Sequence, residues 1–170
     1  MIRALRVLSA LVVVVIGGCH DDVDLTGMYE VTSSVASSPC GNDVAVTAGP
    51  AYLKFHKDSF LGTSYFAYDE CMDALATDCS SAGGLFGGLP EPLDDGWQGR
   101  ASSSSHSGTS CVLSYDETSA RLNGSHLVVE HTLYSDSVDL PEAQCTTDEA
   151  EKRGTKMGCA DHARIEASKR

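Results

Sequence analysis

The sequence predicts a small, mainly β domain: an antiparallel meander that forms a barrel or a sandwich, with a short disulfide-pinned helix and a C-terminal helix. Three observations support this fold class. Between Leu25 and Tyr134 most of the hydrophobic periodicity has a period of two residues, which is typical of half-buried strands. The pair Asn123-Gly124 lies between two alternating runs, which is the pattern of a β-hairpin. The chain has seven cysteines but only 11 aromatic residues, so cross-links would support a thin core.

The first 18 residues have the composition of an export signal. Arg3 and Arg6 precede an uncharged run of 13 residues from Val7 to Cys19. This run is shorter than the ~18 residues needed to cross the hydrocarbon of a bilayer, so a cleaved signal is favoured over a permanent span. We therefore expect a signal peptide over residues 1–18, a short acidic tether over 19–24 and one domain over 25–170.

The residues Ile16-Gly17-Gly18-Cys19 resemble the lipobox of bacterial lipoproteins, in which an aliphatic residue and two small ones precede a lipid-bearing cysteine. The resemblance implies cleavage after Gly18 by a type II signal peptidase, diacylglycerol on the Cys19 thiol and acylation of its amino group. It also implies a lipid-anchored protein of the bacterial cell envelope, and His20 after the cysteine favours the outer membrane. The alternative is an ordinary cleaved signal, with Cys19 as a disulfide partner.

The charge balance limits the possible partners. The chain has 24 acidic and 12 basic side chains, and its formal charge of −12 becomes −14 once Arg3 and Arg6 are removed with the signal. Nucleic-acid binding is disfavoured, because it requires an excess of Lys and Arg. Such a surface attracts cations or basic proteins instead. The tether residues His20 to Asp24 are interpreted as a solvated linker rather than a metal site.

With Cys19 set apart, six cysteines remain, and an even number in an exported chain predicts three disulfides. Zinc is disfavoured because its cysteines usually come in pairs two to four residues apart, whereas the closest pair here is eight apart. The connectivity stays open. The six are Cys40, Cys71, Cys79, Cys111, Cys145 and Cys159.

The segment from Glu70 to Cys79 has the spacing of a short helix, with Cys71, Leu75 and Cys79 on one face. Eight helical residues would separate the two cysteines by ~12 Å, beyond the reach of one disulfide. We therefore expect Cys71 and Cys79 to bond different partners and to pin this helix at both ends.

The Asn123-Gly124 pair predicts a type I′ turn. In the resulting hairpin Ala120 and Leu122 share one face with Leu127, Val129 and His131. A histidine among inward aliphatic positions is a candidate ligand contact, although a hydrogen-bonded core histidine is the commoner arrangement.

Between residues 78 and 108 the chain is rich in Gly and Ser, which predicts a long flexible loop. The loop contains Trp97, the only tryptophan, as a second candidate ligand or partner contact; the alternative is that it folds back against the domain. After it, Thr146 to Glu149 match a capping box, which predicts a broken helix from about Asp148 to Ser168.

The start of the domain, Leu25-Thr26-Gly27-Met28-Tyr29, resembles the Gly-x-aromatic opening of lipocalin-like barrels, although that pattern prefers Trp where Tyr29 stands. The usual motifs of serine hydrolases, zinc proteases and calcium loops are absent from the sequence. We therefore predict a non-enzymatic protein without cofactor or metal, which binds a small apolar or amphipathic ligand. The alternatives are an acidic module that binds a basic protein, such as an inhibitor of a basic envelope enzyme, and a structural surface component.

Overall fold

The computed structural model describes residues 22–82 and 88–170. In these residues the strands form one antiparallel sheet in the order β5-β4-β3-β1-β10-β9-β8-β7-β6, with β2 paired to β1 off this path. The predicted mainly β fold is confirmed. The strands are β1 (Gly27–Ser37), β2 (Val44–Ala45), β3 (Tyr52–Phe60), β4 (Thr63–Cys71), β5 (Cys79–Ser81), β6 (Glu91–Leu93), β7 (Gly96–Ser107), β8 (Ser110–Asn123), β9 (His126–Asp139) and β10 (Cys159–Lys169), with the helix α1 (Thr147–Arg153) and 3-10 turns at Glu142–Gln144 and Gly154–Lys156.

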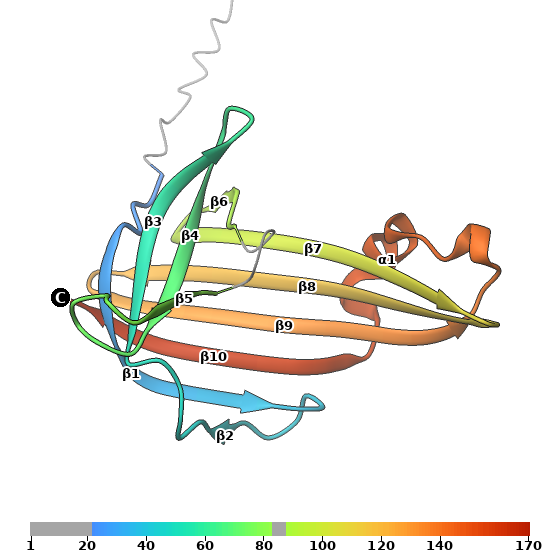
Figure 1. Cartoon of the computed structure of the whole chain (residues 1–170), viewed down its shortest axis with the longest axis horizontal. Coiled ribbons are helices and arrows are strands. Elements are labelled where there is room, and N and C mark those ends of the chain that lie inside the picture. The colour runs from blue at the N-terminus through green and yellow to red at the C-terminus, as the bar shows by residue number, and fades with distance from the viewer. Residues whose placement is uncertain (1–21, 83–87) are drawn as a thin grey trace, which may run out of the picture.

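The sheet bends so that two groups of strands cross. The long strands β7 to β10 run side by side along the molecule, and β3 and β4 cross them steeply at one end (Figure 1). The strand β1 belongs to both groups, because residues 27–30 pair with β3 on one edge and residues 29–37 pair with β10 on the other. A register shift in the β1–β10 pairing between Val31 and Ser33 follows the residues that pair with β3, and such a bulge bends a strand.

The sheet is not closed into a barrel by a continuous ladder of the described strands. Its two ends nevertheless meet at one bridge, where Phe66 of β4 and Leu89 exchange backbone hydrogen bonds of 3.1 and 2.7 Å. This bridge brings the segment before β6 against β4. The strands therefore enclose a space between β4 and β5 on one side and β7 to β10 on the other.

The long strands bury opposite faces at their two ends. Near β3 and β4, Ala120, Leu127 and Val129 pack into a core with aromatic residues, including Tyr29 and Phe55. At the far end the opposite face of β8 packs under α1. The residues buried there are Cys111, Leu113, Tyr115, Ala150 and Met157.

The predicted β8–β9 hairpin is present, with its loop shifted by one residue. Asn123 pairs with His126, so Gly124 and Ser125 form the loop, and of these two only Gly124 has a positive φ, of 63°. A glycine with positive φ in the first loop position is typical of a type II′ turn rather than the expected type I′. The predicted inward face is correct, since Leu127 and Val129 are buried in the core.

The predicted helix over residues 70–79 is wrong. The strand β4 ends at Cys71, the chain reverses, and β5 begins at Cys79. The carboxylate of Asp73 holds the turn, because it accepts hydrogen bonds from the backbone N–H groups of Leu75, Thr77 and Asp78. Such local bonding competes with helix formation. It also brings Cys71 opposite Cys79, with 4.0 Å between their Cα atoms, so that the two cysteines bond each other rather than different partners.

The predicted flexible loop over residues 78–108 is also wrong for the residues described. It contains β5, β6 and all of β7. The serine-rich half of β7 is held by β8, which pairs with it from Gly96↔Arg121 to Ser107↔Ser110. Pairing with β8 has therefore overcome the low strand propensity of this Gly- and Ser-rich segment. The residues 83–87 of this segment lie outside the described part of the chain.

The C-terminal helix is shorter than predicted. The capping box is correct, because the Thr146 side chain accepts a hydrogen bond from the backbone N–H of Glu149 at the start of α1. The helix ends at Arg153, where Gly154 has a φ of 48°. Instead of a second helical part, residues 159–169 form β10, a central strand between β1 and β9. Backbone hydrogen bonds to β1 on one side and to β9 on the other favour a strand over a helix here, which explains the difference.

All six cysteines expected in the domain form disulfides, as predicted. Cys40 bonds Cys159 and joins the loop after β1 to β10. Cys111 bonds Cys145 and ties the segment before α1 to β8. The predicted signal peptide, Cys19 and the first residues of the predicted tether lie outside the described residues.

Candidate functional site

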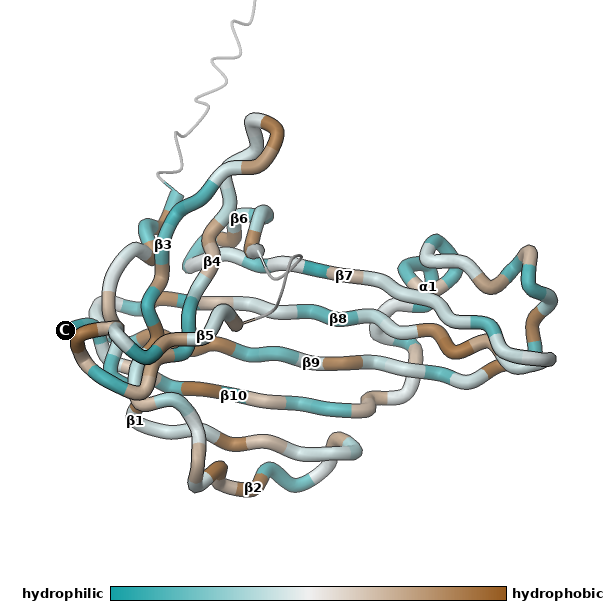
Figure 2. Tube along the Cα trace, in the orientation of Figure 1, coloured by the Kyte–Doolittle hydropathy of each residue, from teal (hydrophilic) through white to brown (hydrophobic). Residues whose placement is uncertain are grey.

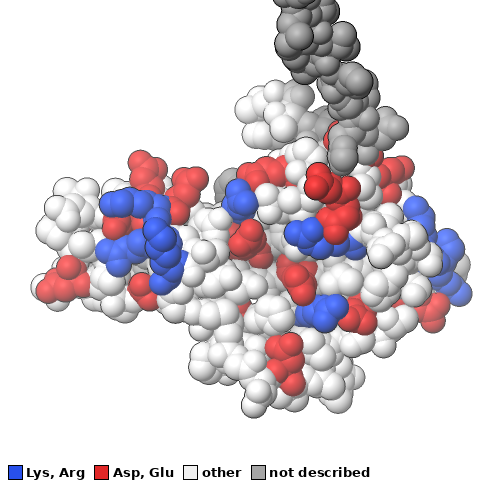
Figure 3. All heavy atoms as spheres, turned by 180° about the vertical axis from the view of Figure 1, so that it is seen from behind, with Lys and Arg blue, Asp and Glu red and all other residues white. Residues whose placement is uncertain are grey.

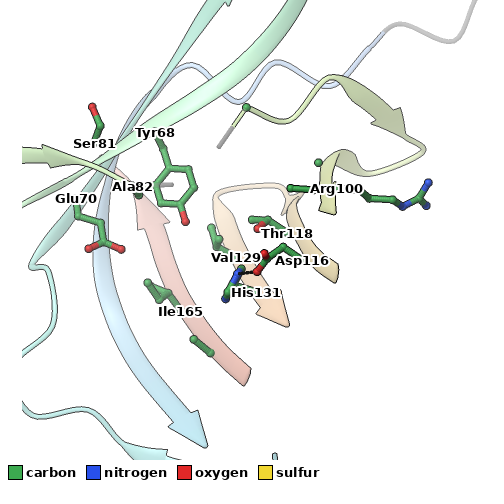
Figure 4. Close-up of a pocket in the computed structure, with 14 residues that line it drawn as sticks. Tyr68, Glu70, Ser81, Ala82, Arg100, Asp116, Thr118, Val129, His131 and Ile165 are labelled. Atoms are coloured by element: carbon green, nitrogen blue, oxygen red, sulfur yellow. Dashed lines mark hydrogen bonds and ion pairs between the residues drawn. The ribbon is translucent and has the colours of Figure 1, made fainter. Parts of the chain in front are cut away.

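A half-open cavity of about 630 Å³ lies between β4–β5 and the inner face of β7 to β10 (Figure 4). Its volume is within the ~300–1,000 Å³ range of small-molecule sites. The floor is apolar, since it is formed by Val129 of β9 together with Ala163 and Ile165 of β10. Residues that pair across adjacent strands lie on the same face of a sheet. Because Ile165 pairs with Val129 and Ala163 pairs with His131, these side chains share the face that lines the cavity.

A glycine allows the cavity wall to form. An added Cβ on Gly99 of β7 would lie only 2.2 Å from the backbone oxygen of Gly88. The absence of a side chain at this position therefore lets the segment before β6 approach β7. Both glycines line the cavity.

His131 and Asp116 form a pair on the cavity floor. The His131 Nε2 atom lies 2.9 Å from Asp116 Oδ1, and both side chains are partly exposed. Because a carboxylate only accepts, Nε2–H donates this bond, and a neutral His131 keeps a lone pair on Nδ1. Among the residues described, Asp116 is the only side chain bonded to the ring, which leaves Nδ1 able to accept a hydrogen bond from a ligand.

Glu70 lies across the cavity from this pair, and its side chain points inward from β4 (Figure 4). Burial raises the pKa of its carboxyl above the ordinary value. Within the described part of the chain, no hydrogen bond or ion pair of this carboxylate is found. A half-buried carboxylate without a partner is costly to the fold, so this group is the strongest sign of a site here.

Tyr68 supplies a hydroxyl beside Glu70. Its ring is buried and stacks on Phe55, with 4.9 Å between ring centroids. Burial, followed by the negative charge of Glu70, raises the pKa of its phenol to about 12. Tyr68 therefore stays neutral and keeps its proton.

Among the residues described, one Arg lines the cavity, and its charge points away from it. The Arg100 side chain points outward in Figure 4 and lies 3.0 Å from Glu91 and 3.7 Å from Glu117. In the described part of the chain, the ionisable groups that face inward are therefore Glu70, Asp116 and His131, together with the Tyr68 phenol. This set favours a ligand that donates hydrogen bonds or carries positive charge.

The two candidate contact residues predicted from the sequence, His131 and Trp97, lie in different surroundings. His131 lies in the cavity, whereas Trp97 is buried in the core with 4% of its surface exposed, and its Nε1–H donates to the Val23 carbonyl. Trp97 therefore folds back, which is the alternative considered for it. Sequence reasoning missed Glu70, because its segment was taken for a helix. It also missed Asp116, although Asp116 has the same strand phase as the inward Ala120.

Comparison with known proteins gives no family: no protein-family model, curated protein or solved structure matches the chain. Within the residues described, no group of three His, Cys, Asp or Glu side chains is arranged to hold a metal ion. The same residues contain no helix with the length and apolar character needed to span a membrane. On the face shown in Figure 3, acidic and basic side chains are interspersed.

Proposed function

We propose that this protein is a non-enzymatic lipoprotein of the bacterial envelope, anchored through Cys19, whose cavity binds a small amphipathic ligand with a hydrogen-bond-donating or cationic head. The observation that carries the binding proposal is Glu70, a half-buried carboxylate without a partner among the described residues, facing an apolar floor. The ligand head would offset its desolvation, and the apolar part would cover Val129 and Ile165. The anchor is supported by the lipobox-like residues 16–19.

Two competitors of equal chain length test the binding proposal. The chain from His20 onward, exported behind a signal without a lipobox, is loaded with the apolar fluorophore N-phenylnaphthylamine. Decylamine and decanoate are then compared as competitors. We expect decylamine to displace the dye at much lower concentration, because its ammonium group faces Glu70 and Asp116 while the decanoate carboxylate is repelled by them.

A matched pair of variants assigns this preference to the cavity. Glu70→Gln removes the inward charge at nearly constant shape and should abolish most of the preference for decylamine. Asp69→Asn removes one charge from the same strand, but Asp69 is not among the residues that line the cavity. Its side chain accepts a hydrogen bond from Ser81 and lies 3.9 Å from His56, so this variant should keep the preference. Equal displacement by both competitors in the wild type, or an unchanged preference in Glu70→Gln, would contradict the proposal.

The anchor has its own test, which is the intact mass of the mature protein. We expect the chain to begin at Cys19 and to carry the mass of diacylglycerol and a further acyl group. The Cys19→Ser variant should lack this mass. A wild-type protein without lipid would refute the anchor and leave the cavity proposal standing.

A further inference from the structure

The tip of the β3–β4 hairpin, defined here as Phe60, Leu61 and Gly62, exposes two large apolar side chains. Phe60 is 68% and Leu61 90% exposed. Phe60 pairs with Thr63, so Leu61 and Gly62 form a two-residue loop in which both φ angles are positive, at 50° and 85°. Figure 2 shows this tip as a hydrophobic end on a more polar hairpin.

Leu61 has no evident purpose within the fold. A positive φ is unfavourable for a leucine, and Asn or Gly usually takes this position in such a turn. The strain is not compensated by burial, since the side chain is almost fully exposed. An exposed leucine in a strained backbone conformation indicates a contact outside the chain.

The strand register shows which way the tip points. Gly27 of β1 pairs with Phe55 of β3, and the two strands are antiparallel. The residues of β3 after Phe55 therefore extend past the start of β1, toward the side on which residues 22–26 enter the domain. Figure 1 shows the hairpin tip and the start of the described chain at the same end of the molecule.

Cys19 lies three residues before Asp22, and three residues of extended chain reach at most about 11 Å. We infer that the tip of the β3–β4 hairpin inserts into the surface of the bilayer that holds the Cys19 lipid, as a second, non-covalent membrane contact. This inference rests on the proposed anchor. A covalent lipid fixes the domain near the bilayer, and two apolar side chains aimed at it would then fix the orientation of the domain.

The charges beside the tip select the kind of bilayer. Asp58 lies just before the tip and Asp24 lies near the start of β1, and hydrogen bonds from Thr26 lower the pKa of the Asp24 carboxyl. Lys57 precedes Asp58, and Lys57 and Lys169 both act on Asp24, so acidic and basic groups are mixed beside the tip. Such a mixed set suits a zwitterionic surface, for example phosphatidylcholine, rather than a strongly charged one.

Leu75 provides a matched control. It is 84% exposed, close to the 90% of Leu61, but it lies in the turn after Cys71, at the opposite end of β4 from the tip. A bilayer contacted by the tip is therefore out of reach of Leu75. The two positions differ in placement rather than in exposure.

The experiment places a tryptophan at each position in the full lipidated protein. Phe60→Trp, Leu61→Trp and Leu75→Trp are reconstituted into phosphatidylcholine vesicles with or without brominated acyl chains, and the emission of wild-type Trp97 is subtracted. We expect bromolipid to quench the new tryptophan at positions 60 and 61 several-fold more than at 75, with emission shifted to shorter wavelength. Flotation with the vesicles and intact mass report the anchor independently.

The outcomes separate the two ideas. Protein that floats with the vesicles but shows equal quenching at 60, 61 and 75 overturns the tip contact and leaves the anchor intact. Protein without lipid that does not float overturns the anchor, and the tip contact falls with it. Greater quenching at both tip positions supports the inference, and agreement between Phe60→Trp and Leu61→Trp shows that it does not depend on one altered side chain.

Discussion

The two ends of the sheet are stabilised in different ways, although β7, β8 and β9 run through both. Near the cavity the inner face packs against β1, β3 and β4, and the core contains Tyr29, Phe55, Phe66 and Trp97. At the far end the opposite face is covered by one short helix and a disulfide between Cys111 and Cys145. The cavity therefore lies beside the larger core, and the Cys111–Cys145 disulfide supports the end where burial is small.

This difference suggests a division of roles. A site needs rigid walls, and aromatic stacking between Phe55 and Tyr68 holds one wall of the cavity in place. The far end contributes no lining residue from α1 to the main cavity. We call the end beside the cavity the near end and the end under α1 the far end. Destabilising substitutions at the near end should abolish ligand binding, whereas those at the far end should leave binding unchanged.

The largest expected effect is a truncation at the near end. Phe55→Ala should lower the free energy of unfolding by between about 3 and 5 kcal/mol, because it removes a buried ring and leaves a cavity. It should also abolish dye binding, since Tyr68 loses the ring on which it stacks. Guanidinium unfolding and N-phenylnaphthylamine titration check the two effects. Binding that survives this loss of stability would mean that the cavity does not depend on the near core.

The next effect is loss of the far disulfide. The double variant Cys111→Ala, Cys145→Ala opens a loop whose ends are 34 residues apart, which typically costs between about 2 and 4 kcal/mol. We expect faster hydrogen exchange in α1 and in the first half of β8, with dye binding retained. Faster exchange in β3 and β4 as well would show that the two ends unfold as one unit.

The sequence predicts the β8–β9 hairpin better than the strands that pair with distant parts of the chain, for a physical reason. Local alternation identifies the inward residues of a hairpin, so Leu127, Val129 and His131 could be placed before the structure was known. It carries no information on which distant strand will pair. The strand β10 was missed because its pairing with β1 and β9 lies far along the chain.

The site was predicted only in part for the same reason. Cys71, Leu75 and Cys79 have helical spacing, yet the hydrogen bonds of Asp73 turn the chain instead. This error hid Glu70, which is inward only if β4 continues to Cys71. His131 was found because its strand was assigned correctly, whereas its bond to Asp116 depends on the pairing of β8 with β9.

A smaller effect tests the helix that covers the far core. Thr146→Ala removes the side-chain oxygen that caps the N-terminus of α1 and should cost about 1 kcal/mol. Thr146→Ser keeps the capping oxygen and serves as the control. Thermal unfolding of both variants, with dye binding as a second readout, should show a loss of stability in the alanine variant alone and no change in affinity. Weaker binding in Thr146→Ala would connect the far end to the cavity.

The smallest effect concerns the pH dependence of the near end. Because burial raises the pKa of Glu70, the native state takes up a proton more readily than the unfolded chain, and stability from this group is lost as pH rises from the ordinary Glu value through the raised one. Without ligand, Glu70→Gln should therefore be slightly more stable than wild type near neutral pH, and this advantage should disappear in acid, where Glu70 is protonated. Denaturant unfolding over this range measures the difference, with Asp69→Asn as the control. A variant that is less stable than wild type at neutral pH would mean that the carboxylate stabilises the fold. A variant that is more stable but no longer prefers decylamine would mean that the protein keeps Glu70 for its ligand.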